Sequence, residues 1–161
     1  MRLRATSVNI LSQSTEVADL ASIVYGITNS GSAFNLRSSG TVNYKIDWGD
    51  GSAEQTSTLN NLAHTFTAGD YTLRLNTDVA YRPFFNDISA DIDQIVSTII
   101  SNDTDLGTNL ENAWSGANNM ITFSCLSQST VNVSNFNNAW LNCSSLTSFP
   151  SIATTNATTF I

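Results

Sequence analysis

The sequence predicts a mainly β protein in which a small β-sandwich is followed by a short solenoid of helix–strand repeats. Short segments in the first half alternate apolar and polar residues, which is the period of half-buried strands. In the second half, LENAW at residues 110–114 returns as FNNAW at residues 136–140, 26 residues later. A fixed period of this length indicates stacked units that bury their apolar faces on one another. Because stacked repeats build extended surfaces, we expect a role in binding or structure.

The composition fits a folded protein with a weakly charged surface. The 161 residues allow one or two small domains, and a hydrophobic content of 41% is enough for a packed core. Six scattered basic residues and a net charge of −7 argue against nucleic acid as a partner, since binding its phosphates requires clustered Lys and Arg. Only 12% of the residues are charged, and an uncharged polar surface is typical of extracellular or particle-exposed proteins.

Residues 1–21 are predicted to form an N-terminal extension that pads the first domain or docks on a partner. Polar residues interrupt the apolar run that a secretory signal requires. No stretch of the chain reaches the roughly eighteen apolar residues of a membrane span. Two explanations reconcile a surface typical of extracellular proteins with the lack of a predicted secretory signal. Either a leader peptide has been removed, or the protein leaves the cell by lysis as part of a virus particle. The initial Met favours the second.

Candidate strands begin after this extension. Residues 23–25, 33–37 and 41–48 are rich in β-branched and aromatic residues, and polar turn residues at 29–31 and 38–40 separate them. In the third segment, apolar side chains alternate with polar ones, as expected for a half-buried strand. The alternating apolar residues are Val42, Tyr44, Ile46 and Trp48.

The next elements continue the same pattern. Residues 49–52 (GDGS) predict a tight turn, because glycine adopts positive φ without strain. We expect a strand over residues 62–66, a turn at residues 68–70 and another alternating strand over residues 71–75. Short strands at such close spacing predict a small antiparallel sandwich.

The segment YKIDWGDGS at residues 44–52, followed by HTF at residues 64–66 and GDYTLRL at residues 69–75, resembles the PKD domain. That resemblance implies an immunoglobulin-like β-sandwich over residues 22–87. It also implies the adhesive or spacer role that the family has on cell surfaces and in viral particles. The signature residues are Trp48, Gly49, Asp50, Gly51, His64, Gly69 and Tyr71.

Residues 88–100 fit two interpretations. Their isoleucines and valines lie at helix-like spacings, yet these residue types favour strands. We favour a strand over residues 95–99, because the repeat requires a strand there. A helix is the alternative.

Within each repeat the pattern predicts a short helix and a short strand. Phe136, Ala139, Trp140 and Cys143 lie at positions i, i+3, i+4 and i+7, one face of a helix. Residues 146–149 then read as a strand that Pro150 ends. The predicted repeat core is Leu110, Trp114, Met120, Phe123, Phe136, Trp140, Cys143, Leu146 and Phe149.

The run AWLNCSSLTSFP at residues 139–150 resembles the BspA-like leucine-rich repeats of bacterial and phage surface proteins. The resemblance implies a repeat unit over residues 88–161. A third copy begins at Thr159 and Phe160 and is incomplete. Because an open solenoid end exposes apolar surface, we expect another subunit to cover it, or more repeats to follow.

No residue pattern in the chain predicts catalysis, a cofactor or a metal site. Cys125 and Cys143 are interpreted as free thiols that pack as small apolar groups, with a disulfide as the alternative. The only histidine, His64, is far from both in sequence, and no CxxC spacing is present. The motifs of nucleophilic hydrolases, P-loop proteins and dinucleotide-binding proteins are also absent. We therefore expect that the protein is not an enzyme.

Four groups of residues have both a functional and a structural interpretation, and we favour the structural one for each. Asp47 and Asp50 could ligate Ca²⁺, but Asp50 is expected to bond its own loop. His64 is expected to make a structural hydrogen bond rather than act as a base. Asp91 and Asp93 are interpreted as a solvated face rather than a glycosidase pair. Finally, Trp114 and Trp140 are expected to be core residues and not a sugar platform.

These observations predict a non-enzymatic virion structural protein, a phage capsid-decoration or fibre component that acts through protein–protein contacts. Its partners would be other virion proteins or copies of itself, with a host-surface glycan or protein as a further partner. The alternatives are a fragment of a bacterial cell-surface adhesin and a carbohydrate-binding accessory module.

Overall fold

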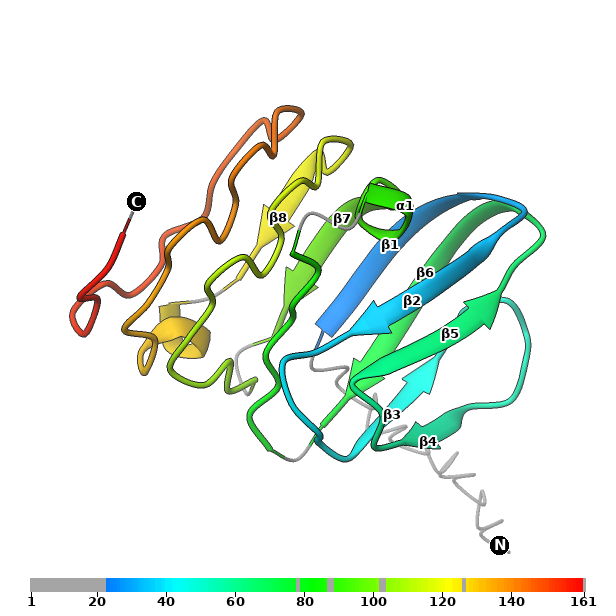
Figure 1. Cartoon of the computed structure of the whole chain (residues 1–161), viewed down its shortest axis with the longest axis horizontal. Coiled ribbons are helices and arrows are strands. Elements are labelled where there is room, and N and C mark those ends of the chain that lie inside the picture. Colours follow the sequence, from blue (N-terminus) through cyan, green and yellow to red (C-terminus); the bar gives the residue numbers. More distant parts are fainter. Residues whose placement is uncertain (1–22, 78, 87–88, 102–103, 126, 161) are drawn as a thin grey trace, which may run out of the picture.

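The chain is mainly β in a computed structural model (Figure 1), which describes residues 23–77, 79–86, 89–101, 104–125 and 127–160. The extension predicted at residues 1–21 lies outside these residues. A six-stranded sheet has the order β4-β3-β6-β1-β7-β8, and a two-stranded sheet pairs β2 with β5. Neighbouring strands are antiparallel except β7 and β8, which are parallel.

The strands are short and most of them follow the predicted alternation. The larger sheet contains β4 (Gln55–Ser57), β3 (Tyr44–Asp47), β6 (Ala68–Asn76), β1 (Ile23–Ser30), β7 (Ile95–Ile100) and β8 (Thr122–Ser124). The smaller sheet contains β2 (Ala33–Arg37) and β5 (Asn61–Thr65). Among the described residues the helical elements are α1 (Ser89–Ile92) and a 3₁₀ turn, η1 (Ser127–Thr130).

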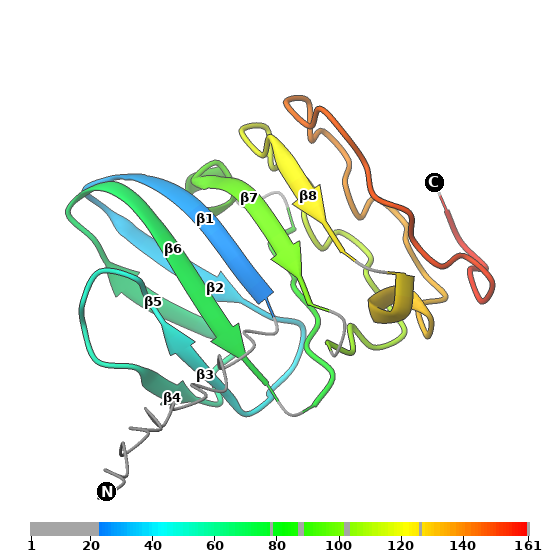
Figure 2. The same ribbon diagram turned by 180° about the vertical axis from the view of Figure 1, so that it is seen from behind.

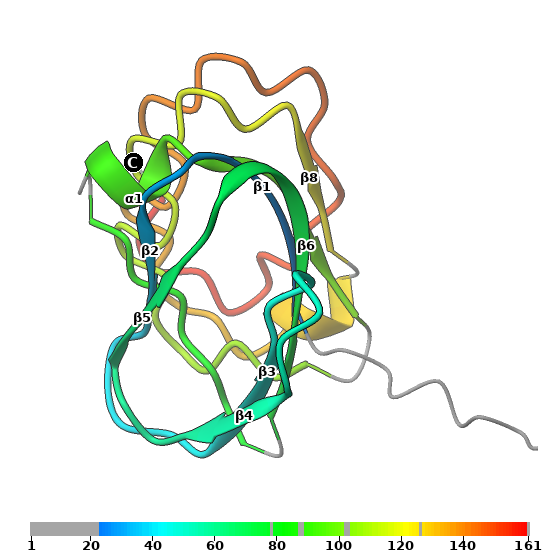
Figure 3. The same ribbon diagram turned by 90° about the vertical axis from the view of Figure 1, so that its right-hand side faces the viewer.

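The apolar side chains of both sheets meet in one core. Alternate residues of β1 are buried, as are Tyr44 and Ile46 of β3 and Phe34 and Leu36 of β2. Figure 3 shows the two sheets curving around this core. The arrangement is compatible with a β-sandwich, and it follows from the period-2 pattern, which places alternate side chains on opposite faces.

Two of the predicted strands agree closely with the structure. The segment at residues 33–37 is β2, and the segment at residues 95–99 lies within β7. The helical alternative for residues 88–100 is therefore wrong over β7, and only the single turn α1 precedes it. The strand β4 was not predicted, because its three residues are all polar and carry no apolar alternation.

The turn predicted at residues 68–70 is wrong, since these residues begin β6. Gly69 and Asp70 pair with Asn29 and Thr28 of β1. The Asp70 carboxylate also accepts a hydrogen bond of 2.7 Å from the Thr28 hydroxyl. Polar residues typical of turns are accommodated here because Ala68 and Asp70, at the start of β6, are exposed to water.

The repeated segments form two stacked coils beside the sheet, coil A (residues 108–125) and coil B (residues 134–149). Their backbones are joined by hydrogen bonds of 2.8–3.0 Å from alternate N–H groups of coil A to carbonyls of coil B. In Figures 1 and 2 the coils lie beyond β7, on the side away from β3 and β4, and β8 is the strand of coil A. The four bonds run from Leu110, Asn112, Trp114 and Gly116 to Asn135, Asn137, Ala139 and Leu141.

The helix predicted within each repeat is wrong, because residues 136–143 form successive tight turns. Ala139 N–H donates to the Phe136 carbonyl (3.0 Å), and Cys143 N–H donates to the Trp140 carbonyl (3.2 Å). Asn138, which lies within the first of these turns, has a φ of 53°. This left-handed conformation does not occur inside an α-helix. The turns keep apolar residues three or four positions apart on one side, which explains the helix-like pattern.

The strand predicted at residues 146–149 is also absent from coil B, whereas its counterpart in coil A is β8. β8 pairs with β7, but the corresponding part of coil B bonds to coil A at Thr147 N–H, which donates to the Ile121 carbonyl (3.2 Å). A β-strand forms only where a neighbouring strand pairs with it at several successive residues. Coil A has such a neighbour in β7, so the repeated sequence forms a strand in coil A and not in coil B. β7 pairs with both β1 and β8, so the sheet is continuous across the predicted boundary at residue 87.

Candidate functional site

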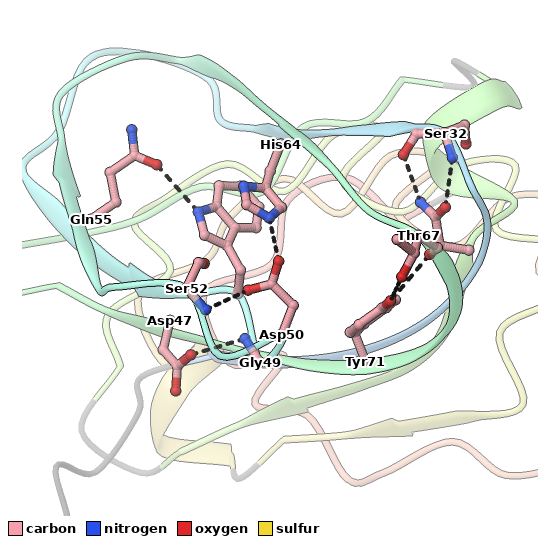
Figure 4. A network of polar contacts seen from close by, with 11 residues as sticks. Ser32, Asp47, Gly49, Asp50, Ser52, Gln55, His64, Thr67 and Tyr71 are labelled. Atoms are coloured by element: carbon pink, nitrogen blue, oxygen red, sulfur yellow. Dashed lines mark hydrogen bonds and ion pairs between the residues drawn. The ribbon is translucent and has the colours of Figure 1, made fainter.

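Part of the predicted signature lies together where His64 meets Asp50 and the loop at residues 49–52 (Figure 4), and Trp48, which precedes this loop, is buried. The ring of His64, from β5, stacks on the indole with centroids 4.5 Å apart and planes 11° from parallel. His64 Nε2 lies 2.7 Å from Asp50 Oδ2. At the edge of the indole, Trp48 Nε1 donates to Gln55 Oε1 of β4 (3.2 Å). The sequence placed Trp48 and His64 in one signature, and the structure brings them into direct contact.

The loop at residues 49–52 is closed by its own polar groups. Asp50 Oδ1 accepts from the Ser52 N–H (3.0 Å), and Asp47 Oδ1 accepts from the Gly49 N–H (2.9 Å). Hydrogen bonds from Ser52 and His64 hold the pKa of Asp50 well below its usual range. A Cβ on Gly49, whose φ is 73°, would lie 2.3 Å from the Thr72 carbonyl oxygen, so this position requires glycine. Both carboxylates therefore organise the loop, and no cluster suited to a metal ion is found among the described residues.

The order of these groups differs from that of a nucleophilic triad. In a triad, the histidine lies between the carboxylate and the nucleophile that it activates. Here Asp50 lies between Ser52 and His64, and one face of the imidazole is covered by Trp48. The arrangement fixes the loop at residues 49–52 against β5 and does not activate the Ser52 hydroxyl.

The remaining signature residues also have structural contacts. The Tyr71 hydroxyl donates to the Thr67 carbonyl (3.1 Å), and the Tyr71 ring packs on Phe66 with centroids 4.5 Å apart. A Cβ on Gly69 would lie 3.3 Å from the Tyr71 hydroxyl oxygen, so a larger residue would crowd the tyrosine. Gly51 has a φ of 84°, which the turn at residues 49–52 requires.

Asp91 is buried and ion-paired, so the solvated face predicted for it is wrong. Its Oδ2 accepts from Arg37 Nε (2.9 Å) and Nη2 (2.8 Å), and its Oδ1 accepts from the Asn35 N–H (3.0 Å) and side-chain amide (2.9 Å). The side chain of Asp91 is only 3% exposed. The pair joins α1 to β2 and Asp93 is not part of it, so the two carboxylates form no catalytic pair.

Both cysteines are free thiols, as the sequence favoured. Cys125 is buried, and the Cys143 thiol donates to the Trp114 carbonyl (3.3 Å). Burial raises the pKa of each thiol to about 11. Both sulfurs therefore stay protonated at neutral pH and pack as small apolar groups.

The repeat core is an aromatic ladder between the coils. Trp114 stacks on Trp140, and Phe123 stacks on Phe149 with centroids 5.9 Å apart. The members from coil A are buried, as predicted. In coil B Phe136 is buried as well, whereas Trp140, Cys143 and Leu146 are only partly buried. Phe149 is 46% exposed, so its assignment to the core is wrong.

Coil B has an apolar hollow of about 420 Å³ on the side away from coil A. Leu141 and Phe160 at its rim are 49% and 57% exposed. Its other lining residues are Phe136, Asn138, Ala139, Trp140 and Phe149. Contiguous exposed apolar surface of this kind makes the hollow a candidate binding site.

The surface around the hollow carries no charge. From residue 112 to residue 161 the sequence contains no Asp, Glu, Lys, Arg or His, although the chain has a net charge of −7. A neutral apolar site selects an uncharged partner surface, because a charged group would lose its water without gaining an ion pair.

Asparagines with positive φ recur at the 26-residue period of the repeat. Asn86, Asn112 and Asn138 are spaced 26 residues apart and have φ of 47°, 56° and 53°. Asparagine tolerates the left-handed conformation better than other non-glycine residues. Its recurrence at a fixed period was the signal for a turn, and against a helix, at this position.

Comparison of the chain with models of protein families, with curated proteins and with solved structures found no match. None of the helices among the described residues has the length and apolar character needed to cross a bilayer.

Proposed function

We propose that this protein is a non-enzymatic structural component of a virus particle, a phage capsid-decoration or fibre protein, and that it assembles through the hollow of coil B. The observation that carries the proposal is the exposed apolar surface of that hollow. Folded proteins seldom leave contiguous apolar surface open to water unless a partner covers it.

The charge distribution supports assembly. A protein of net charge −7 repels others like it. In this chain, however, the 50 residues from 112 to 161 are uncharged. A contact made through coil B therefore keeps the acidic part of each subunit away from the interface.

For the finer fold we propose a PKD-like sandwich that carries BspA-like repeats. The contact of Trp48 with His64 and the closed loop at residues 49–52 support the first assignment. The stacking of coils A and B at a 26-residue period supports the second, although the turns in the coils differ from the expected helices. In this proposal the sandwich acts as the spacer or docking module and the coils make the outer contact.

Mass spectrometry of purified virions tests the proposal. We expect the chain to be present in them at a fixed ratio to the major capsid protein, and its absence would refute the assignment. Enrichment in a bacterial cell-surface fraction instead would favour the adhesin.

A pair of variants tests whether the hollow is the contact. Leu141→Asp places a charge at the rim of the hollow, and we expect it to abolish incorporation into particles. Leu59→Asp is the matched control, because Leu59 is also exposed (56%) but belongs to the loop before β5. Equal incorporation of the two variants would show that the hollow is not the contact surface.

A further inference from the structure

The backbone of coil A shows how one coil binds the next. The N–H groups of Asn112, Trp114 and Gly116 all point toward coil B and donate to its carbonyls, at 3.0, 2.8 and 2.8 Å. The donors are alternate residues, which is the pattern by which a strand edge binds a parallel partner. The side chains add the Trp114–Trp140 stack to these bonds.

Coil B presents the same donors on its open side. Asn138, Trp140 and Asn142 are the equivalents of the three coil A donors, and the turn geometry is preserved, since Asn142 (φ 63°) replaces Gly116 (φ 87°). Within the described part of the chain the backbone N–H groups of these three residues have no hydrogen-bond acceptor. The donor that precedes them in the series, the Phe136 N–H, does have an acceptor, the Thr159 carbonyl at 2.9 Å.

We propose that this open edge of coil B binds a neutral peptide segment of another polypeptide. The segment runs parallel to residues 136–142 and accepts hydrogen bonds from the N–H groups of Asn138, Trp140 and Asn142. Its apolar side chains fill the hollow between Trp140 and Phe160. The proposal rests on the proposed function in requiring a protein partner, and it adds the chemistry by which that partner is recognised. Addition of a segment to an exposed backbone edge is a known mode of peptide recognition.

The donor pattern argues against a second copy of the same face as the occupant. Two coil B edges placed against each other would bring N–H groups toward N–H groups. The carbonyls of Asn137, Ala139 and Leu141 cannot serve as acceptors, because coil A already occupies them. The partner must therefore supply free carbonyls, as an extended or turn-rich segment does.

The lining of the hollow argues against a glycan or a charged peptide. Asn138 is the only polar residue among those that line it. The three N–H groups at its edge donate and cannot accept, so most of a sugar's hydroxyl protons would lose water without gaining an acceptor. An acidic or basic segment would find no ion-pairing partner, since residues 112–161 carry no charge.

Coil B itself indicates which side chains fit. On coil A, the Asn135 carbonyl accepts from the Leu110 N–H and Trp140 stacks on Trp114. A peptide with the sequence of residues 134–147 (SNFNNAWLNCSSLT), with Cys143→Ser to prevent disulfide formation, is therefore a suitable probe. Its scrambled version is the control.

The experiment is a titration of the full chain, labelled with ¹⁵N, with this peptide. We expect saturable shifts and slowed hydrogen exchange at the backbone amides of Asn138, Trp140 and Asn142, and no effect of the scrambled peptide. Leu141→Asp should weaken binding by about tenfold or more, because it places an unpaired charge at the apolar rim that the peptide covers. Val131→Asp, at a residue that is 42% exposed and does not line the hollow, should bind as the unmodified chain does.

Several outcomes would overturn the proposal. One is the absence of binding by a chain whose other amide signals show that it is folded. Another is peptide binding that shifts amides outside coil B. Protection of the three amides by self-association, in the absence of peptide, would identify a second copy as the occupant. Binding of a glycan but not of the peptide would identify a carbohydrate site. Presence of the chain in virions together with any of these results would leave the proposed function standing and remove only this inference.

Discussion

The indole rings of Trp114 and Trp140 stack with centroids 5.5 Å apart and planes 11° from parallel, although 26 residues separate them. The contact sets the register of coil A on coil B, because the backbone bond from Trp114 N–H to the Ala139 carbonyl lies beside it. The stability of the coils should therefore depend on the two rings unequally, since Trp114 is fully buried and Trp140 is only partly buried.

Trp114→Ala should lower the free energy of unfolding by about 3–5 kcal/mol, the usual cost of removing a buried aromatic residue. Trp140→Ala should cost less, because one side of its ring already faces the hollow. Urea denaturation of the two single variants and the double variant measures both costs and their coupling. Equal costs for the two substitutions would contradict the view that coil A is core and coil B is its exposed cover.

The left-handed turn at Asn138 should respond to substitution according to backbone conformation. Asn138→Ala should destabilise the protein by about 1 kcal/mol, because alanine is strained at positive φ, whereas Asn138→Gly should be close to neutral. Asn137→Ala, at a neighbouring residue outside the positive-φ set, is the control and should have little effect. Thermal denaturation ranks the three variants, and a glycine variant less stable than the alanine variant would refute this account.

The buried Asp91 carboxylate should make the protein sensitive to loss of Arg37. Arg37→Met leaves the carboxylate buried without its ion-pair partner, and we expect a loss of about 3–5 kcal/mol. The exposed pair of Lys45 and Glu54, at 3.6 Å, provides the control. Lys45→Met should cost about 0–1 kcal/mol, the range of surface ion pairs. Chemical denaturation distinguishes the two, and similar costs would show that the Arg37–Asp91 pair is not effectively buried.

Asp50 should make the stability of the sandwich depend on pH. Hydrogen bonds from Ser52 and His64 lower the pKa of its carboxyl in the folded state below the ordinary value of 3.8. A lowered folded-state pKa contributes stability above the ordinary value, and that contribution is lost as the pH falls through the lowered one. The stability difference between the unmodified chain and Asp50→Asn should therefore be larger at pH 7 than at about pH 3. A difference that grows on acidification, measured by urea denaturation at both pH values, would have the wrong sign.

Two buried tyrosines differ in whether their hydroxyl has a partner. The Tyr81 hydroxyl donates to the Arg37 carbonyl (3.1 Å), whereas the Tyr25 hydroxyl is buried without a partner among the described residues. Tyr81→Phe should cost about 1 kcal/mol, because it removes this hydrogen bond and leaves the Arg37 carbonyl with only the longer bond from the Phe84 N–H (3.4 Å). Tyr25→Phe should be neutral or slightly stabilising. Thermal denaturation of the two variants, both of fully buried residues, gives the comparison, and a larger loss for Tyr25→Phe would contradict it.

The sequence by itself determined the elements whose pattern depends on near neighbours. Alternation in β3 and β6 placed Tyr44, Ile46 and Leu73 in the core, since side chains of a strand point to opposite faces whatever the strand pairs with. The 26-residue period predicted stacked units, because equivalent positions in stacked coils must fill equivalent spaces. The two glycines of the turn at residues 49–52 followed from their freedom to adopt positive φ.

Only the tertiary structure decided the features that depend on a distant partner. The spacing of Phe136, Ala139 and Trp140 fits any backbone with three to four residues per turn, and the bonds between coils A and B selected turns over a helix. The sequence around Asp91 is typical of an exposed segment, but α1 places this carboxylate beside Arg37, where it is buried. The sequence of coil B resembles that of a core, yet Phe149 is exposed, because burial depends on which segment lies on the other side.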